Sequence, residues 1–93
     1  MDTGASYTIV PRPILEALGC RPVRMRRVVL PDGRTDEWAL THIDLECEGR
    51  RTPTPVLMGS PAGRARLGAV TLDELGFGVD PTARRLVPGD ALV

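Results

Sequence analysis

The chain has 93 residues, 42% of them hydrophobic, which suffices for one small domain with a thin core. Twelve arginines balance twelve acidic residues, and this zero net charge argues against nucleic acid or an anionic membrane surface as the main partner. No apolar run has the length of a membrane span and no secretion signal opens the chain, so we expect a cytoplasmic protein. Cys20 and Cys47 lack metal-ligand spacing and are expected to be reduced core residues.

The first predicted elements are a strand and a short helix. Residues 6–10 are β-branched and aromatic, which favours a strand, and Pro11 ends it. Residues 13–19 then predict a helix that begins at a proline and stops at Gly19.

A long hairpin follows. Residues 23–30 and 35–47 predict two strands joined by PDGR, in which Asp32-Gly33 is a strong turn signal. Both strands change their apolar face partway along, as expected for a hairpin that packs on the body at its base and covers something else at its tip. In the first strand, Val23 and Met25 point to one face, and Val28 and Leu30 point to the other. In the second strand, alternate residues from Ala39 to Cys47 share one face, and Trp38 and Leu40 lie on the opposite face.

The second half predicts further short elements. Residues 52–58 form a strand with two prolines, which we expect at the edge of a sheet. Residues 67–76 predict an apolar-glycine step and then a short helix, with Thr71 as its N-cap and Gly76 as its stop. Residues 77–87 predict strand, turn and strand. The sum is a mostly β domain with six or seven strands and two short helices.

The chemistry of the chain is carried by DTGAS at its start. In aspartic proteolysis two carboxylates share one proton, and one of them activates a water molecule. Asp2 supplies the carboxylate, Thr3 a short hydroxyl that can lock the pair, and Gly4 room for close backbone approach. Ala5 and Ser6 have small side chains, which keeps the loop narrow. The tripeptide alone is weak, since an ordinary N-terminal turn could also carry it.

The order DTGAS, PILEALG, LPDGR and LGAVTLDELGFGVDP resembles the retropepsin-like (retroviral-type, clan AA) aspartic proteases, most closely their small prokaryotic branch. The resemblance runs from Asp2 to about Pro88. It implies an all-β fold, a retropepsin-like acid-protease barrel with one or two short helices and a flap hairpin. The domain would span residues 1–88, and residues 89–93 would be a frayed tail.

The resemblance also implies the site. Asp2 would be catalytic, with Thr3, Gly4 and Ala5 supporting the loop. Leu67 and Gly68 would pack under that loop. The flap would bind substrate through a set of hairpin residues: Asp32, Gly33, Arg34 and Trp38. For Trp38 and Leu40, a place in the ordinary core is an equally good alternative.

The chain contains a single DTG motif, so a working dyad must come from Asp2 and its symmetry mate in a homodimer. The resemblance implies the same dimer, with an extended peptide bound as a strand between flap and floor. Neither metal nor cofactor is required. Activity is expected to peak at mildly acidic pH, where one carboxyl of the pair is protonated and the other ionised.

Other candidate sites are weaker. His42 is the single histidine and has no partner at metal or triad spacing. Ser6 has no base in its motif, and residues 59–68 are glycine-rich but lack the Lys-Ser/Thr of a phosphate-binding loop. The arginine pairs at 26–27, 50–51 and 84–85 are interpreted as solvated faces, with a preference for acidic substrates as the less favoured alternative.

In one respect the chain departs from the family pattern, because the apolar strand that normally runs into the catalytic Asp is absent. The α-amino group one residue before Asp2 would also favour its ionised form. One explanation is that Met1 is internal and the protein begins upstream, which we favour. The other is a truncated chain that has lost activity and serves as a dimerisation or peptide-binding module.

Overall fold

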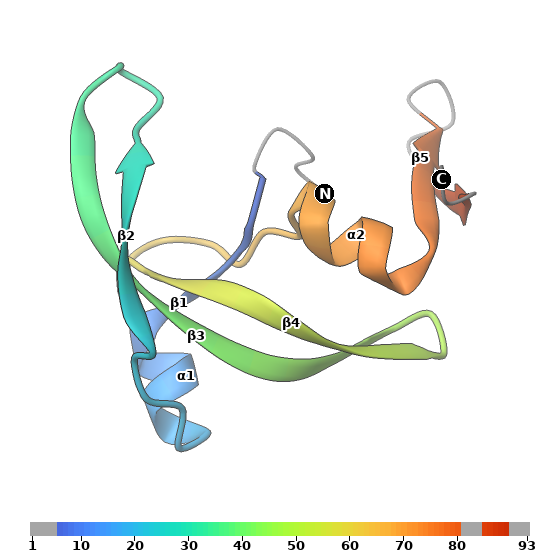
Figure 1. The fold of residues 1–93 in the computed structure, drawn as a ribbon, viewed down its shortest axis with the longest axis horizontal. Coiled ribbons are helices and arrows are strands. Elements are labelled where there is room, and N and C mark those ends of the chain that lie inside the picture. Colours follow the sequence, from blue (N-terminus) through green and yellow to red (C-terminus); the bar gives the residue numbers. More distant parts are fainter. Residues whose placement is uncertain (1–5, 81–84, 90–93) are drawn as a thin grey trace.

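The computed structural model describes residues 6–80 and 85–89 (Figure 1). The proposed catalytic residue Asp2 and its supports Thr3, Gly4 and Ala5 therefore lie outside the described residues, as do the turn at 81–84 and most of the predicted tail. Six strands and two helices are present in the described part: β1 (Thr8–Pro11), α1 (Arg12–Ala17), β2 (Arg24–Val29), β3 (Thr35–Cys47), β4 (Arg50–Gly59), α2 (Ala69–Leu75), β5 (Phe77–Asp80) and β6 (Arg85–Pro88).

The strands form two separate sheets. The larger has the order β1-β4-β3-β2, in which β1 runs parallel to β4 and the other neighbours are antiparallel. The smaller is the β5–β6 pair. The mostly β prediction is thus confirmed, whereas the described residues close no barrel. None of the helices in the described ranges is long and apolar enough to cross a membrane.

The β2–β3 hairpin stands away from the rest of the sheet (Figure 1). Its turn forms where Asp32-Gly33 predicts it. Gly33 has a φ of 87°, a left-handed conformation that favours glycine, and its N–H donates to the carbonyl of Leu30 at 2.9 Å. The strand β3 spans Thr35–Cys47, as the alternation predicts.

The prediction that the proline-containing strand lies at an edge is wrong for half of its length. Pro53 and Pro55 lie in the part of β4 that pairs with β3 alone, so their missing N–H groups cost no pairing with β1. The following stretch from Val56 to Gly59 pairs with β1, and its first residues also pair with β3. An apolar run without prolines is suited to this central position.

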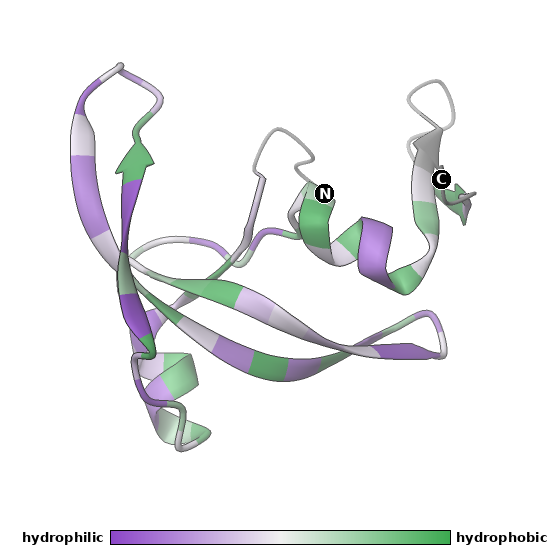
Figure 2. Cartoon of the chain, viewed as in Figure 1, coloured by the Kyte–Doolittle hydropathy of each residue, from purple (hydrophilic) through white to green (hydrophobic). Residues whose placement is uncertain are grey.

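Successive residues of the large sheet point to opposite faces, and both faces are used. Hydrophobic and hydrophilic residues alternate visibly along β3 (Figure 2). One face carries the buried core with α1, formed by Leu15, Ala39, Val56 and Met58, with Val10, Cys20 and Ile43 packed against it. The opposite face of β1 and β4 lines a cavity, described below. This two-sided use explains why three successive residues, 39–41, are all buried.

The base of the outgoing hairpin strand differs from its prediction. Val23 and Met25 are 61% and 55% exposed, so they are not packed into the core, although Met25 lies directly opposite the core residue Ala39. Val28 and Leu30, toward the tip, are half-buried. Cys20 and Cys47 are both half-buried and are not joined by a disulfide. At the other end, the N–H of Gly89 donates to the carbonyl of Gly76 at 2.8 Å, so the chain is still anchored at residue 89, where the predicted frayed tail begins.

Candidate functional site

The segment directly after DTGA is held by the beginning of α2. The N–H of Gly68 donates to Thr8 Oγ1 at 3.0 Å, and the N–H of Val70 donates to the carbonyl of Ser6 at 3.0 Å. A Cβ atom at Gly68 would lie 2.1 Å from the carbonyl carbon of Tyr7, so only glycine permits this approach. The Leu67-Gly68 step, predicted to pack under the catalytic loop, is therefore placed against the residues that immediately follow that loop.

Three buried threonines fix this contact from the other side. Thr71 lies within α2, where its hydroxyl is 2.5 Å from Thr8 Oγ1 and 2.8 Å from Thr54 Oγ1. All three side chains are at most 2% exposed. The prediction of Thr71 as the N-cap is wrong, because α2 begins two residues earlier after Gly68 and the hydroxyl is engaged in tertiary bonds. The network joins β1, β4 and α2 next to the segment that follows the proposed catalytic loop.

Replacing Thr71 by Val is expected to lower the free energy of unfolding by about 1–3 kcal/mol, because it leaves the buried Thr54 hydroxyl without its partner. Urea unfolding measures this change. Thr71→Ser, which keeps the hydroxyl, should cost less than Val. The double variant Thr54→Val/Thr71→Val should cost less than the two single changes summed. If the double variant loses as much stability as the two single variants together, the hydroxyls of Thr54 and Thr71 do not interact as the network requires.

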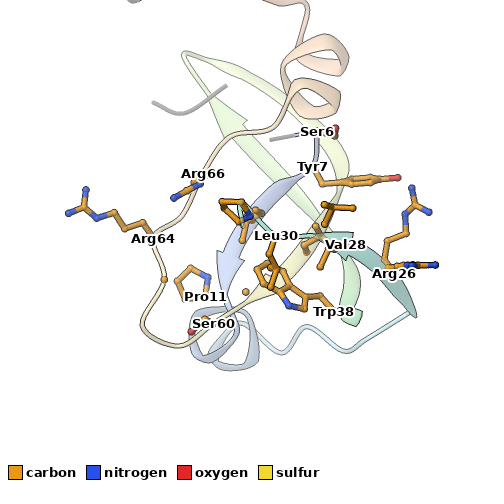
Figure 3. A pocket seen from close by; sticks show the side chains of 17 residues that line it. Ser6, Tyr7, Pro11, Arg26, Val28, Leu30, Trp38, Ser60, Arg64 and Arg66 are labelled. Carbon is orange, nitrogen blue, oxygen red and sulfur yellow. The ribbon is translucent and has the colours of Figure 1, made fainter. Parts of the chain in front are cut away.

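A cavity of about 710 Å³ lies between the hairpin and the face of β1 and β4 that is turned away from the core (Figure 3). Its floor includes Ile9, Pro11 and Leu57. The hairpin contributes residues 26–31 and Trp38, and the loop after β4 contributes the far wall through Ser60, Gly63, Arg64 and Arg66. The cavity therefore has an apolar floor, a hairpin cover and a wall with arginines.

Of the four predicted flap residues, only Trp38 lines this cavity. Asp32, Gly33 and Arg34 lie at the exposed turn, where Asp32 accepts hydrogen bonds from the backbone N–H and the Nε of Arg34 at 3.0 and 2.6 Å. Their substrate-binding role stays a prediction. Leu40 is 1% exposed and does not line the cavity, so of the two interpretations offered for it the core interpretation is confirmed.

The hairpin touches the floor through one ring contact. The guanidinium of Arg26 lies 5.5 Å from the centre of the Tyr7 ring, a cation–π distance. Tyr7 is two residues beyond the proposed catalytic loop and precedes the threonine that holds α2. On the returning strand, the indole N–H of Trp38 donates to Asp36 at 3.2 Å, which orients the ring. The Arg26–Tyr7 contact thus joins the hairpin to the floor, and the Trp38–Asp36 bond acts within the hairpin.

Of the weaker candidates, Ser6, the arginine pair 26–27 and part of residues 59–68 line the cavity, whereas His42 does not. His42 is exposed on β3 opposite Pro55. In residues 6–80 and 85–89, no group of three or more histidine, cysteine or acidic side chains could hold a metal ion. The threonine network and the cavity arginines from the loop after β4 were not singled out from the sequence. The network joins residues 63 and 17 positions apart, which no local pattern signals.

The arrangement is a covered cleft with a rigid floor. The residues that follow DTGA form part of this floor, because Ser6, Tyr7 and Ile9 line the cavity. Comparisons of the chain with protein-family models, with curated proteins and with solved structures found no match.

Proposed function

We propose that the chain is one protomer of a homodimeric, cytoplasmic aspartic endopeptidase with a retropepsin-like fold. Asp2 of each protomer would contribute one carboxylate to a dyad that shares a proton. One carboxylate would take a proton from water, and the protonated partner would donate to the oxygen of the scissile carbonyl. Thr3, Gly4 and Ala5 would hold the loop.

The observation that carries this proposal is the contact of Gly68 with the backbone of Tyr7 and Thr8. A catalytic carboxylate on a short loop needs its flank fixed to within about half an ångström. The glycine approach, the two hydrogen bonds from the N–H groups of Gly68 and Val70, and the threonine network fix the residues that immediately follow the motif, which supports the proposal. The cavity lined by Ser6 and Tyr7 would offer room for an extended peptide.

The proposal is tested by peptide hydrolysis at mildly acidic pH over a dilution series. Because each dyad needs two chains, specific activity should fall as the dimer dissociates. A peptide with a statine-type hydroxyl in place of the scissile bond should inhibit, and a chelator should not. Hydrolysis that is indifferent to both dilution and the statine peptide would contradict the proposal.

The alternative is a non-catalytic peptide-binding or dimerisation module. It is favoured by the apolar floor and the hairpin cover of the cavity, which offer a place for a peptide without any catalytic group. This function predicts that peptides bind without being cleaved at any protein concentration. Peptide binding and peptide cleavage, measured on the same preparation, therefore separate the two functions.

A further inference from the structure

We propose that the cavity selects an extended peptide in which an apolar side chain is flanked by acidic side chains. The inference rests on the proposed function in taking the occupant to be the peptide that the site acts on. It goes further in naming the chemistry of that peptide. The grounds are the charge of the cavity walls, their separation by an apolar strip, and the open edge of the hairpin.

The described lining of the cavity is one-sided in charge. Four of its seventeen residues are arginines and none is acidic, although the whole chain is neutral. Two arginines outside the cavity are, by contrast, paired with acidic side chains. Arg34 and Arg51 lie 2.6 and 3.2 Å from carboxylates of their own chain. Within the described residues, Arg26 and Arg64 form no such ion pair, so their guanidinium groups are open to a carboxylate from outside.

These two arginines lie on opposite walls. Figure 3 shows Arg64 on the loop side and Arg26 on the hairpin side, with Val28, Leu30 and Trp38 between them. The ring of Tyr7 holds Arg26 in place, which lowers the entropy lost when it binds. The cavity thus presents a cation, an apolar strip and a second cation in that order.

An extended peptide matches this order because its side chains on one face recur every second residue. Acidic residues two positions before and two after an apolar residue would face the two walls while the apolar residue covers the strip. Guanidinium groups favour carboxylates through charge-assisted hydrogen bonds. The peptide backbone can pair with β2, which is the last strand of the large sheet and has one edge unpaired in the described residues. A single-stranded nucleic acid fits less well, since the chain has no net positive charge.

The test is binding of two labelled peptides of equal length to the whole chain, measured by fluorescence anisotropy. One peptide has Leu at its centre and Glu two residues away on each side, and the other has Gln in place of both Glu residues. We expect the Glu peptide to bind about tenfold more tightly. This ratio should fall to about one in Arg26→Gln/Arg64→Gln. It should persist in the matched control Arg12→Gln/Arg21→Gln, whose positions are exposed and lie outside the cavity lining.

A general loss of protein stability leaves the ratio of the two affinities unchanged, because both peptides are measured with the same protein. A ratio near one in the unaltered chain, or an unchanged ratio in Arg26→Gln/Arg64→Gln, would overturn the inference. So would equal competition by a single-stranded oligonucleotide of the same charge, which would indicate unspecific anion binding. Selective binding without cleavage would support the inference while contradicting the proteolytic function. Cleavage of the Glu and Gln peptides at equal rates would contradict the inference while supporting the proteolytic function.

Discussion

Replacing Asp2 by Asn is expected to lower kcat/KM for peptide hydrolysis by about a thousandfold, while the dimer still forms. In the proposed dyad one carboxylate would accept a proton from water while the other would donate one to the substrate. An amide can neither accept that proton nor share one with its partner, so the general-base contribution is lost. Steady-state hydrolysis of one peptide by both proteins, at equal chain concentration, measures the effect.

Mixed dimers test whether each active site needs a carboxylate from both chains. When unaltered chains and chains carrying Asp2→Asn are mixed in equal amounts and allowed to exchange, about a quarter of the dimers have two carboxylates. Activity per unaltered chain should then fall to about half, because the dimers that it forms with the variant are inactive. Activity that stays proportional to the unaltered chain alone would show that each protomer acts independently. An Asp2→Asn protein as active as its parent would contradict the catalytic assignment outright.

Replacing Gly68 by Ala is expected to lower the free energy of unfolding by about 3 kcal/mol or more, a large share of the stability of a small domain. The added Cβ would meet backbone atoms of Tyr7 and Thr8 at 2.1 and 2.4 Å, and backbone cannot rotate away as a side chain can. The chain must therefore separate β1 from the start of α2. Urea unfolding followed by circular dichroism gives the change.

Gly78→Ala is the matched control, because a Cβ there meets its nearest neighbour, a methyl group of Val87, at an ordinary 3.8 Å. It should change stability by less than about 1 kcal/mol. Equal stability of the two variants would show that the close approach of Gly68 is not needed. Partial destabilisation with folding retained should also reduce peptide hydrolysis, since the flank of the catalytic loop moves with Tyr7.

Local patterns in the sequence predict the hairpin well and the middle of the sheet less well. A turn pair and an alternating strand specify the bounds of β3, since both act between near neighbours. For β4, the prolines favour an edge and the apolar run after them favours a centre, and the structure uses both along one strand. The exposed Val23 and Met25 show the limit of inferring a buried face from apolar residues alone.

The site was predictable where it depends on residue type and not where it depends on long-range contact. Gly68 could be assigned a packing role from the resemblance, and it is found against the backbone of Tyr7 and Thr8. The Thr71 hydroxyl has the local signature of a helix cap, but Thr8 and Thr54 compete for it from distant strands. The placement of Arg26 opposite Arg64 across the cavity likewise arises only after the chain has folded.

The two edges of the β2–β3–β4 portion of the sheet differ in how they would meet another chain. On β4, Pro53 and Pro55 remove donors from the half that β1 leaves uncovered, so an added strand would find few bonds there. On β2 the donors remain, but Arg24, Arg26 and Arg27 crowd its first half. Two such edges repel each other, which protects the protein from polymerising through its hairpin. The same arginines leave the β2 edge open to a strand with negatively charged side chains. These arginines would therefore both limit aggregation and select the ligand.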